Sequence, residues 1–244
     1  MNRYDRLDSV RTQNRHLSSI KCFFYFLKVE GYIAHDPSEA LSYAKEPRLL
    51  PQSSLTHSEM KKILAIPNTT TLIGYRDRTI LELLYSTAIR KAELMNLKLM
   101  DVDYEGGYLR VNQGKGSKDR VTPIGQIAGR YLETYIKGIR PLFLNAKISD
   151  SLFLSQRGHA LSKNALADMI SKYAKASGLN KPVTTHTFRR SCATEMIKHH
   201  ANIMHVKDLL GHSCMESIQS YCNLSIVDLK KAHQQYHPRE KDPV

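Results

Sequence analysis

Apolar residues in this chain recur at helical spacing through most of its 244 residues, and the pattern changes in the middle of the chain. There the segments GGYLRVNQ (106–113) and DRVTPIG (119–125) have the short apolar and β-branched runs that are typical of strands. The GKGSK segment between them supplies glycines, which permit the backbone angles of a tight turn. A hairpin set among helical segments predicts a mainly α fold with a small antiparallel β-sheet (α+β).

The segment EPRLLPQSS (46–54) brings two prolines and polar residues together, which favours an extended linker. It separates a small module, residues 1–45, from a larger region, residues 55–244. In the module, helical spacing of apolar residues predicts a first helix that ends near Gly31. The segment HDPSEALSYA (35–44), with Pro37 near its first turn, predicts a short second helix. We therefore expect two or three helices that fold separately from the larger region.

In the larger region, Thr56 and Glu59 form the pattern of a capping box and predict the start of a helix. Further helices are expected at Arg76–Tyr85, 91–98, 125–138 and 163–177, the last one closed by Gly178. From Thr185 the chain reads as helical almost to its end. The breaks and caps expected in that part are Gly211, NLS at 223–225, Ser213 with Glu216, and Ser225 with Asp228.

The charge of the chain indicates an anionic partner. Its 36 lysines and arginines against 23 aspartates and glutamates give a formal net charge of +13. Nucleic acid is the usual partner of such a chain, because basic side chains gain affinity from the counterions that phosphates release. The alternative is a protein that is merely basic and soluble, since charge by itself says nothing about catalysis.

Other sequence features argue against several classes of protein. The four cysteines form no CxxC pair, so neither a zinc knuckle nor a redox pair is indicated, and the chain is expected to be reduced and intracellular. The polar N-terminus is not that of a signal peptide, and no stretch approaches the length of a membrane span. A metal site built from His199, His200 and His205 lacks a standard ligand spacing.

Several side chains have types and positions that suit phosphate chemistry. His186 and Arg189 are three residues apart, so on a helix they lie on one face and can donate together to phosphate oxygens. His212 follows the turn glycine Gly211, and Tyr221 stands nine residues later in an expected helix. Each feature has an ordinary structural alternative: a solvated helix face, a structural histidine or a core tyrosine.

Two further features stand upstream. Arg90 directly follows an apolar helical segment, and Glu93 is placed to orient it, although a surface ion pair would give the same pattern. Lys115 would be presented at the tip of the expected hairpin, although a plain basic turn explains it equally well. Each signal is weak alone, whereas their order and spacing together are strong.

Four motifs in that order resemble those of the tyrosine recombinases, or phage-type integrases, and most closely the Xer-type branch. STAIRKAEL (86–94) is similar to ATGLR-x-x-E-L, and GKGSKDRVTP (114–123) to GKG-x-K-x-R-x-x-P. HTFRR (186–190) is similar to H-x-L-R-H, and LLGHSCMESIQSY (209–221) to L-L-G-H-S followed by Q-x-Y. The resemblance runs from about Leu55 to Pro238. Upstream it extends weakly into 23–41, which resembles the end of the core-binding domain of the family, so this module looks like a partial one.

The resemblance implies a role for each matched residue. Tyr221 is expected to be the nucleophile, Arg90 and Arg189 to hold the scissile phosphate, and Lys115 to be the general acid. His186 and His212 are expected to add contacts and handle protons, with Glu93 in a supporting position. Arg190 stands where the family usually has histidine and is expected to add a phosphate contact. The residues expected to bind DNA are Lys118, Arg120, Arg190, Arg15 and Lys21.

The chemistry needs these residue types because the transition state of phosphodiester cleavage carries extra negative charge on its equatorial oxygens. Arginine stabilises such charge well, since its planar fork remains protonated and binds phosphate bidentately. A 3'-phosphotyrosine intermediate stores the energy of the broken bond, so no ATP and no metal cofactor is expected, and the sequence shows neither a P-loop nor a carboxylate cluster.

The resemblance also implies the partners and the outcome. The expected substrate is double-stranded DNA in the cytoplasm, at the nucleoid, and the expected outcome is integration, excision or dimer resolution. The segment SIVDLKKAHQQY (225–236) places Ile226, Leu229, His233 and Tyr236 on one stripe, which either packs on the chain's own core or docks on a neighbour within a tetramer on two DNA sites. The alternative functions are a type IB topoisomerase and a DNA-binding regulator without catalysis.

Overall fold

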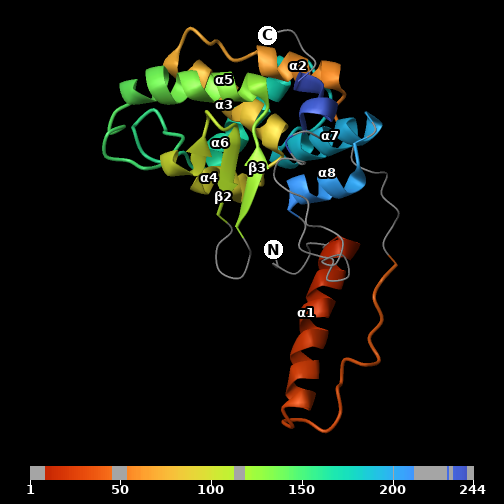
Figure 1. The fold of residues 1–244 in the computed structure, drawn as a ribbon. Coiled ribbons are helices and arrows are strands. Elements are labelled where there is room, and N and C mark those ends of the chain that lie inside the picture. Colours follow the sequence, from red (N-terminus) through yellow and green to blue (C-terminus); the bar gives the residue numbers. More distant parts are fainter. Residues whose placement is uncertain are drawn as a thin grey trace, which may run out of the picture. The chain divides into compact units, whose positions relative to one another are not determined.

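The computed structural model of the chain describes residues 9–45, 54–112, 119–199, 201–211, 230 and 233–240. The chain divides into two compact units, Met1–Gln52 and Ser53–Val244 (Figure 1). Most of the predicted linker, 46–53, lies outside the described residues, so the linker remains a prediction. In the described part of the chain, no helix has the length and apolar character that crossing a membrane requires.

The small unit contains one helix within residues 9–45, α1 (Val10–Val29). The hydroxyl of Ser9 accepts a hydrogen bond from the backbone N–H of Thr12 at its start, and Gly31, at φ +76°, follows its end as predicted. The chain then returns along α1. The side-chain amide of Asn14 exchanges two hydrogen bonds with the backbone of Ala44, and Lys28 forms an ion pair with Glu39.

The predicted second helix at 35–44 is wrong, because the structure has only a turn at 37–40 there. Ser38 donates both its N–H and its hydroxyl to the Asp36 carboxylate, at 2.7 and 2.6 Å. Such side-chain bonds to local polar groups offer the backbone an alternative to the helical ladder. A segment this short also needs tertiary packing to stay helical, and most of its side chains are exposed.

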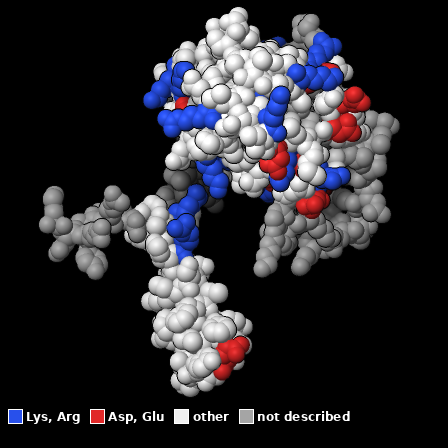
Figure 2. Space-filling model, turned by 90° about the vertical axis from the view of Figure 1, so that its left-hand side faces the viewer, with Lys and Arg blue, Asp and Glu red and all other residues white. Residues whose placement is uncertain are grey.

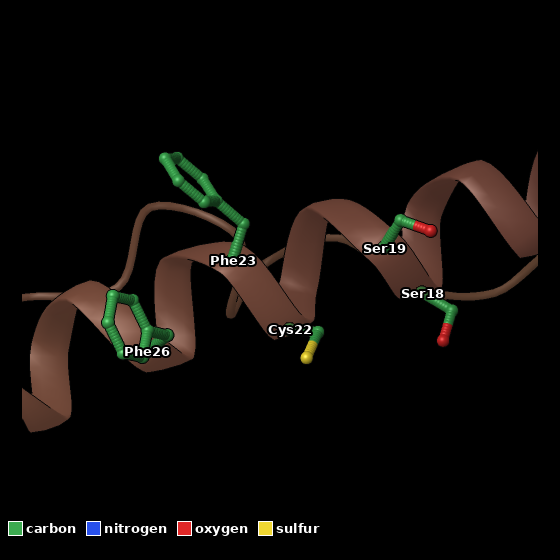
Figure 3. A pocket seen from close by; sticks show the side chains of 5 residues that line it. All are labelled: Ser18, Ser19, Cys22, Phe23 and Phe26. Atoms are coloured by element: carbon green, nitrogen blue, oxygen red, sulfur yellow. The ribbon is translucent and has the colours of Figure 1, made fainter. Parts of the chain in front are cut away.

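The return segment leaves one side of α1 uncovered within the small unit. Figure 3 shows Ser18, Ser19, Cys22, Phe23 and Phe26 along a shallow hollow on α1. Phe23 and Phe26 are 57% and 53% exposed, and no residue of α1 is buried. The small unit therefore has almost no core of its own within residues 9–45.

In its described residues, the large unit is mainly helical with one small antiparallel sheet, which confirms the predicted fold class (Figure 1). The strands of the sheet lie in the order β1 (Val102–Asp103), β2 (Tyr108–Val111) and β3 (Arg120–Pro123), and Val111 at the end of β2 pairs with Arg120 at the start of β3. The predicted capping box of Thr56 and Glu59 is present. The helices are α2 (His57–Ala65), α3 (Leu72–Thr87), α4 (Lys91–Asn96), α5 (Gln126–Thr134), α6 (Lys163–Ala176), α7 (Thr185–Lys198) and α8 (Ile203–Leu210).

Short helical turns complete the unit. A π-helical turn, Tyr135–Ile139, continues α5, so the predicted helix at 125–138 is present with a changed hydrogen-bond pattern in its last part. The 3-10 turns are Leu99–Asp101, Arg140–Leu142 and Pro238–Glu240. Gly178, at φ +71°, lies just after α6, as predicted.

The core of the large unit is built around α3. Its second half is buried on nearly every side, with Ile80, Leu83 and Tyr85 fully inaccessible, and it packs mainly against α5 and α7. A helix buried on all sides must pair its charged residues. Glu82, which is 1% exposed, accordingly accepts from both Arg78 and Arg239.

The last described segment of the chain packs on the large unit's own core at the end of α3. Nε2 of His233 lies 2.6 Å from the carbonyl oxygen of Ser86, and Nε2 of His237 lies 3.1 Å from that of Tyr85. The Glu240 carboxylate accepts from the backbone N–H of Gln126 at the start of α5. Of the predicted apolar stripe, His233 and Tyr236 pack against the core, whereas Ile226 and Leu229 lie outside the described residues.

These two histidines make the docking of the tail sensitive to acid. Burial lowers the pKa of His233 from 6.5 to about 4. Burial also lowers the pKa of His237 well below 6.5, and the neighbouring His233 adds to this effect. Both rings donate Nε2–H to a carbonyl, and Nδ1 of His237 accepts the backbone N–H of Arg239 at 3.2 Å, so the neutral form fits. Because unfolding allows both rings to take up a proton, the stability that they contribute is complete above pH 6.5 and is lost as the pH falls toward 4.

We expect the free energy of unfolding of the protein to fall between pH 6.5 and pH 4 by more than that of the His233→Gln variant. A glutamine amide can still donate to the Ser86 carbonyl but does not titrate. The difference should be on the order of 3 kcal/mol at the acid end. Urea unfolding at a series of pH values measures it, and parallel pH profiles for the two proteins would contradict the neutral buried histidine.

Candidate active site

Arg90 lies just beyond the end of α3, where the chain turns into α4. Ala88 ends α3 in the left-handed conformation, at φ +51° and ψ +27°, and Arg90 then takes an extended conformation as the N-cap of α4. Nη1 of Arg90 donates to Glu93 at 2.8 Å, and Nη2 donates to the Gly211 carbonyl oxygen at 2.8 Å. The Arg90 side chain is 34% exposed, so it can reach a ligand in solvent.

Arg189 is buried in the first half of α7 and bridges the ends of two other helices. Its Nη1 donates to the Ala88 carbonyl oxygen at 2.5 Å, and its Nη2 donates to the Leu210 carbonyl oxygen at the end of α8. A cation is stabilised at a helix C-terminus by the unpaired carbonyls and the helix dipole. Burial, together with the nearby positive charges of Arg90 and Arg120, lowers the pKa of Arg189 to about 10, so the side chain remains charged at neutral pH.

The two arginines meet at the end of α8, because they bind the carbonyls of consecutive residues, Leu210 and Gly211. Gly211 has φ +59° and ends the helix in the left-handed region, as the sequence predicted. The next residue in the chain is His212. The fold thus brings together three segments that are far apart in sequence, and all three belong to predicted site motifs.

Glu93 holds Arg90 in place and is shared with a third arginine. Its carboxylate accepts from the backbone N–H of Arg90 at 2.6 Å, and from Nη1 and Nη2 of Arg120 at 2.8 and 2.9 Å. Burial would raise the pKa of Glu93, but the hydrogen bonds from Arg120 and Arg90 outweigh it and lower the pKa to about 2. The carboxylate is therefore ionised at neutral pH.

The electrostatic balance of this group favours an anion. Arg90, Arg120 and Arg189 carry three positive charges, and Glu93 carries the only negative charge that directly bonds any of them among the described residues. Each terminal nitrogen of a guanidinium carries two hydrogens, so Nη1 and Nη2 of Arg90 retain donors after binding Glu93 and Gly211. The arrangement can hold a phosphate-sized anion at the exposed edge of Arg90.

The remaining predicted residues have varied outcomes. His186 is exposed on the first turn of α7, whereas Arg189, one turn later, is buried, so the two side chains differ in surroundings. Arg190 is exposed beside them. In the small unit, Arg15 is exposed and Nζ of Lys21 lies 5.9 Å from the ring centre of Tyr43. Four predicted residues lie outside the described residues: Lys115, Lys118, His212 and Tyr221.

The sequence did not reveal the backbone part of the site. Nothing in the motifs indicated that the carbonyls of Ala88, Leu210 and Gly211 would orient the two arginines. Arg120 was predicted as a DNA contact, and the structure shows it on Glu93 instead of projecting outward. Among the described residues, no group of three or more histidine, cysteine, aspartate or glutamate side chains could hold a metal ion.

Comparisons with known proteins place this geometry in context. Residues 53–226 match the model of the phage integrase family. The tyrosine recombinase XerD of Staphylococcus saprophyticus is 37% identical over 236 residues, which cover 97% of this chain and 79% of that protein. The crystal structure of XerA recombinase is similar at 25% identity and a TM-score of 0.62, covering 90% of this chain and 82% of that one.

A DNA complex is among the similar structures. Lambda integrase (75–356), solved as a dimer bound to a COC' core site, is 25% identical with a TM-score of 0.64, and the match covers 84% of this chain and 72% of that chain.

Ala88 offers a direct test of how the end of α3 positions the site. A residue with a Cβ in the left-handed region costs roughly 1–2 kcal/mol relative to the right-handed region, and a β-branched residue costs more. Ala88 is also fully buried, so added methyl groups would collide with the core. We expect Ala88→Val to lower the free energy of unfolding by more than about 2 kcal/mol.

The matched control is Ala88→Gly. Glycine relieves the backbone strain but loses a buried methyl group and adds freedom to the unfolded chain, so its net effect should stay within about 1 kcal/mol. Urea unfolding followed by circular dichroism compares the two variants. Equal stability of the valine variant and the original chain would rule out the left-handed conformation at this position.

Proposed function

The chain belongs to the phage integrase family, and we propose that its three-arginine cluster holds the phosphate at which DNA is cut. The membership confirms the resemblance that the four motifs predicted. The chain is a site-specific tyrosine recombinase, an enzyme that cleaves and rejoins DNA strands. The observation that carries the proposed site is the convergence of Arg90 and Arg189 on consecutive carbonyls directly before His212.

Arg90 and Arg189 would stabilise the negative charge that develops on the non-bridging oxygens during cleavage. Both are fixed before the substrate arrives, since each already binds backbone carbonyls, and Arg90 also binds Glu93. Donors that are oriented in advance need no reorganisation at the moment of reaction, and this is usually the largest contribution to catalysis. Because burial removes water from Arg189, its charge acts in a medium of low dielectric constant.

The resemblance to the family motifs supports a proposed role for each reacting group. Tyr221 would attack the phosphorus, forming a Tyr–O–P bond as the bond from phosphorus to the 5' oxygen breaks. Lys115 would donate a proton to the leaving 5' oxygen, and His186 and His212 would contact the phosphate and accept the phenolic proton, whose pKa is ordinarily near 10. The 3'-phosphotyrosine retains the energy of the broken bond, so attack by a 5' hydroxyl rejoins the strand.

Double-stranded DNA is the substrate. Lambda integrase (75–356) binds its core site as a dimer, and for this chain we propose a homo-oligomer that becomes a tetramer on two DNA sites. Figure 2 shows lysine and arginine side chains spread over one face of the large unit, and those of the small unit gathered toward one end, away from the acidic ones. The residues proposed to contact the DNA phosphates are Lys118, Arg190, Arg15 and Lys21.

The domain assignment follows from this function. Residues 1–45 would be a partial DNA-binding module, residues 46–54 a linker, and residues 55–244 the catalytic domain. The proposed location is the cytoplasm, at the nucleoid, because the DNA substrate lies there. The similarity to XerD favours recombination over both a type IB topoisomerase and a regulator without catalysis.

Covalent capture of DNA tests this function without knowledge of the recognition site. The protein is incubated with a pool of randomised duplexes that carry a nick near the middle. When cleavage occurs close to the nick, the short fragment with the free 5' hydroxyl diffuses away, so the strand cannot be rejoined and the covalent intermediate is trapped. Adducts are isolated under denaturing conditions, and the attached DNA is sequenced. We expect a consensus sequence to emerge and a protein band to shift by the mass of one strand.

In the same assay, Tyr221→Phe should form no adduct while still binding DNA, because only the nucleophilic hydroxyl is removed. Arg189→Ala should cut the rate of adduct formation by orders of magnitude, since one preorganised donor to a charged transition state contributes about 2.7–4 kcal/mol. An adduct formed by the Tyr221→Phe variant would mean that another residue attacks.

The role of Lys115 has a separate test. Lys115→Ala should fail to cleave the enriched duplex yet cleave a duplex whose leaving 5' oxygen is replaced by sulfur, because a sulfur leaving group needs no proton. Lys118→Ala is the matched control from the same hairpin. If the sulfur substrate rescues Lys118→Ala and not Lys115→Ala, the general acid is Lys118.

A further inference from the structure

Arg120 is the least expected member of the arginine cluster, because it stands at the start of β3 and reaches back to α4. It is separated by twenty-seven positions from Glu93, yet its two terminal nitrogens form a parallel fork with both carboxylate oxygens of Glu93. Such bidentate pairs are the strongest and most directional of the ion pairs in proteins. Arg90, by contrast, places only one terminal nitrogen on Glu93.

Little of Arg120 remains accessible to DNA. Its side chain is 13% exposed, and its Nε is buried with no hydrogen-bond partner among the described residues. Its guanidinium lies against the backbone of Gly211, so closely that a Cβ on Gly211 would fall 2.9 Å from Cζ of Arg120. Arg120 therefore fills the space between Glu93 and the end of α8, where Arg90 also binds.

Because Glu93 is negatively charged, the contact between Arg120 and Glu93 affects the positive charge that Arg90 presents to a phosphate. A buried carboxylate that was bonded to Arg90 alone would cancel most of the positive charge of Arg90 toward a phosphate. Because Glu93 also binds Arg120, its negative charge is divided between two guanidinium groups. The net charge of the group then stays positive, while Glu93 still fixes the orientation of Arg90.

Arg120 also ties the hairpin to the arginine pair. It pairs with Val111 at the last register position of the β2–β3 ladder, and the sequence between these two residues carries Lys115. The fork to Glu93 anchors that end of β3 on α4. One side chain thus links the start of β3 with the residue that orients Arg90.

We propose that Arg120 is a positioning residue for strand cleavage, which acts by sharing Glu93 with Arg90 so that Arg90 keeps both its orientation and its charge toward the phosphate. The inference rests on the proposed function, in which Arg90 binds the scissile phosphate. It assigns Arg120 to the cleavage step and not to DNA affinity.

The test compares Arg120→Met, Arg120→Lys, Glu93→Gln and the double variant Arg120→Met/Glu93→Gln. The probe is the nicked duplex enriched by covalent capture. Thermal unfolding confirms that each variant is folded, and titration at several salt concentrations gives its DNA affinity. Adduct formation is then timed at saturating DNA. Arg110→Met, an exposed arginine on the neighbouring strand β2, is the matched control and should cleave at the normal rate.

We expect Arg120→Met to cleave about a hundredfold more slowly at saturating DNA, as a misplaced catalytic group does, with its DNA affinity and salt dependence unchanged. The double variant should cleave faster than Arg120→Met, because removing the charge of Glu93 frees Arg90. Arg120→Lys should lie in between, since it keeps the charge and loses the fork.

Other outcomes would overturn the inference. Arg120 would be a DNA contact if Arg120→Met binds DNA more weakly, with a salt dependence reduced by about one phosphate contact, yet cleaves normally at saturating DNA. A lower Tm with no recovery in the double variant would make it purely structural. The Arg90→Ala variant distinguishes a failure of the proposed function from a failure of this inference. Normal cleavage by Arg90→Ala would contradict the proposed function. If Arg90→Ala does not cleave while Arg120→Met cleaves normally, only this inference is wrong.

Discussion

The C-terminal turn of α3 is the constraint on which the rest of the large unit depends. The last carbonyls of a helix have no partner within the helix, and those of α3 are buried, so other parts of the chain must supply donors. His237 and His233 bind the carbonyls of Tyr85 and Ser86, and Arg189 binds that of Ala88. The last described segment of the chain and the buried arginine Arg189 are thus fixed by the same turn of helix.

This arrangement explains why a strained residue stands at the end of α3. With Ala88 in the left-handed region, the helix ends and the chain reaches Arg90 in two residues. The carbonyl of Ala88 is thereby presented to Arg189, and the backbone N–H of Arg90 reaches Glu93. The strain of one residue is offset by hydrogen bonds to charged groups, which are stronger than those between neutral groups.

Local features of the fold were predictable from the sequence because their causes are local. The capping box of α2, the ends of α1 and α6 at glycines, and the β2–β3 hairpin all depend on residues within a few positions of one another. The predicted second helix of the small unit is absent because such a short helix needs burial to be stable, and the spacing of its residues could not reveal whether they are buried. Hydrogen bonds between Ser38 and Asp36 form there instead.

In the candidate site, too, the local features were predictable from the sequence and the long-range contacts were not. The sequence by itself determined the residue types, their order and the family, because the chemistry of phosphate transfer requires arginines, a proton donor and a nucleophile in recognisable motifs. It also determined the pair of Arg90 and Glu93, which are three residues apart at the start of α4. Only the tertiary structure decided that Arg120 would share Glu93, and that Arg90 and Arg189 would meet at Leu210 and Gly211. Those contacts join positions more than twenty residues apart, and their geometry follows from how α3, α4, α7, α8 and β3 pack, which no local pattern encodes.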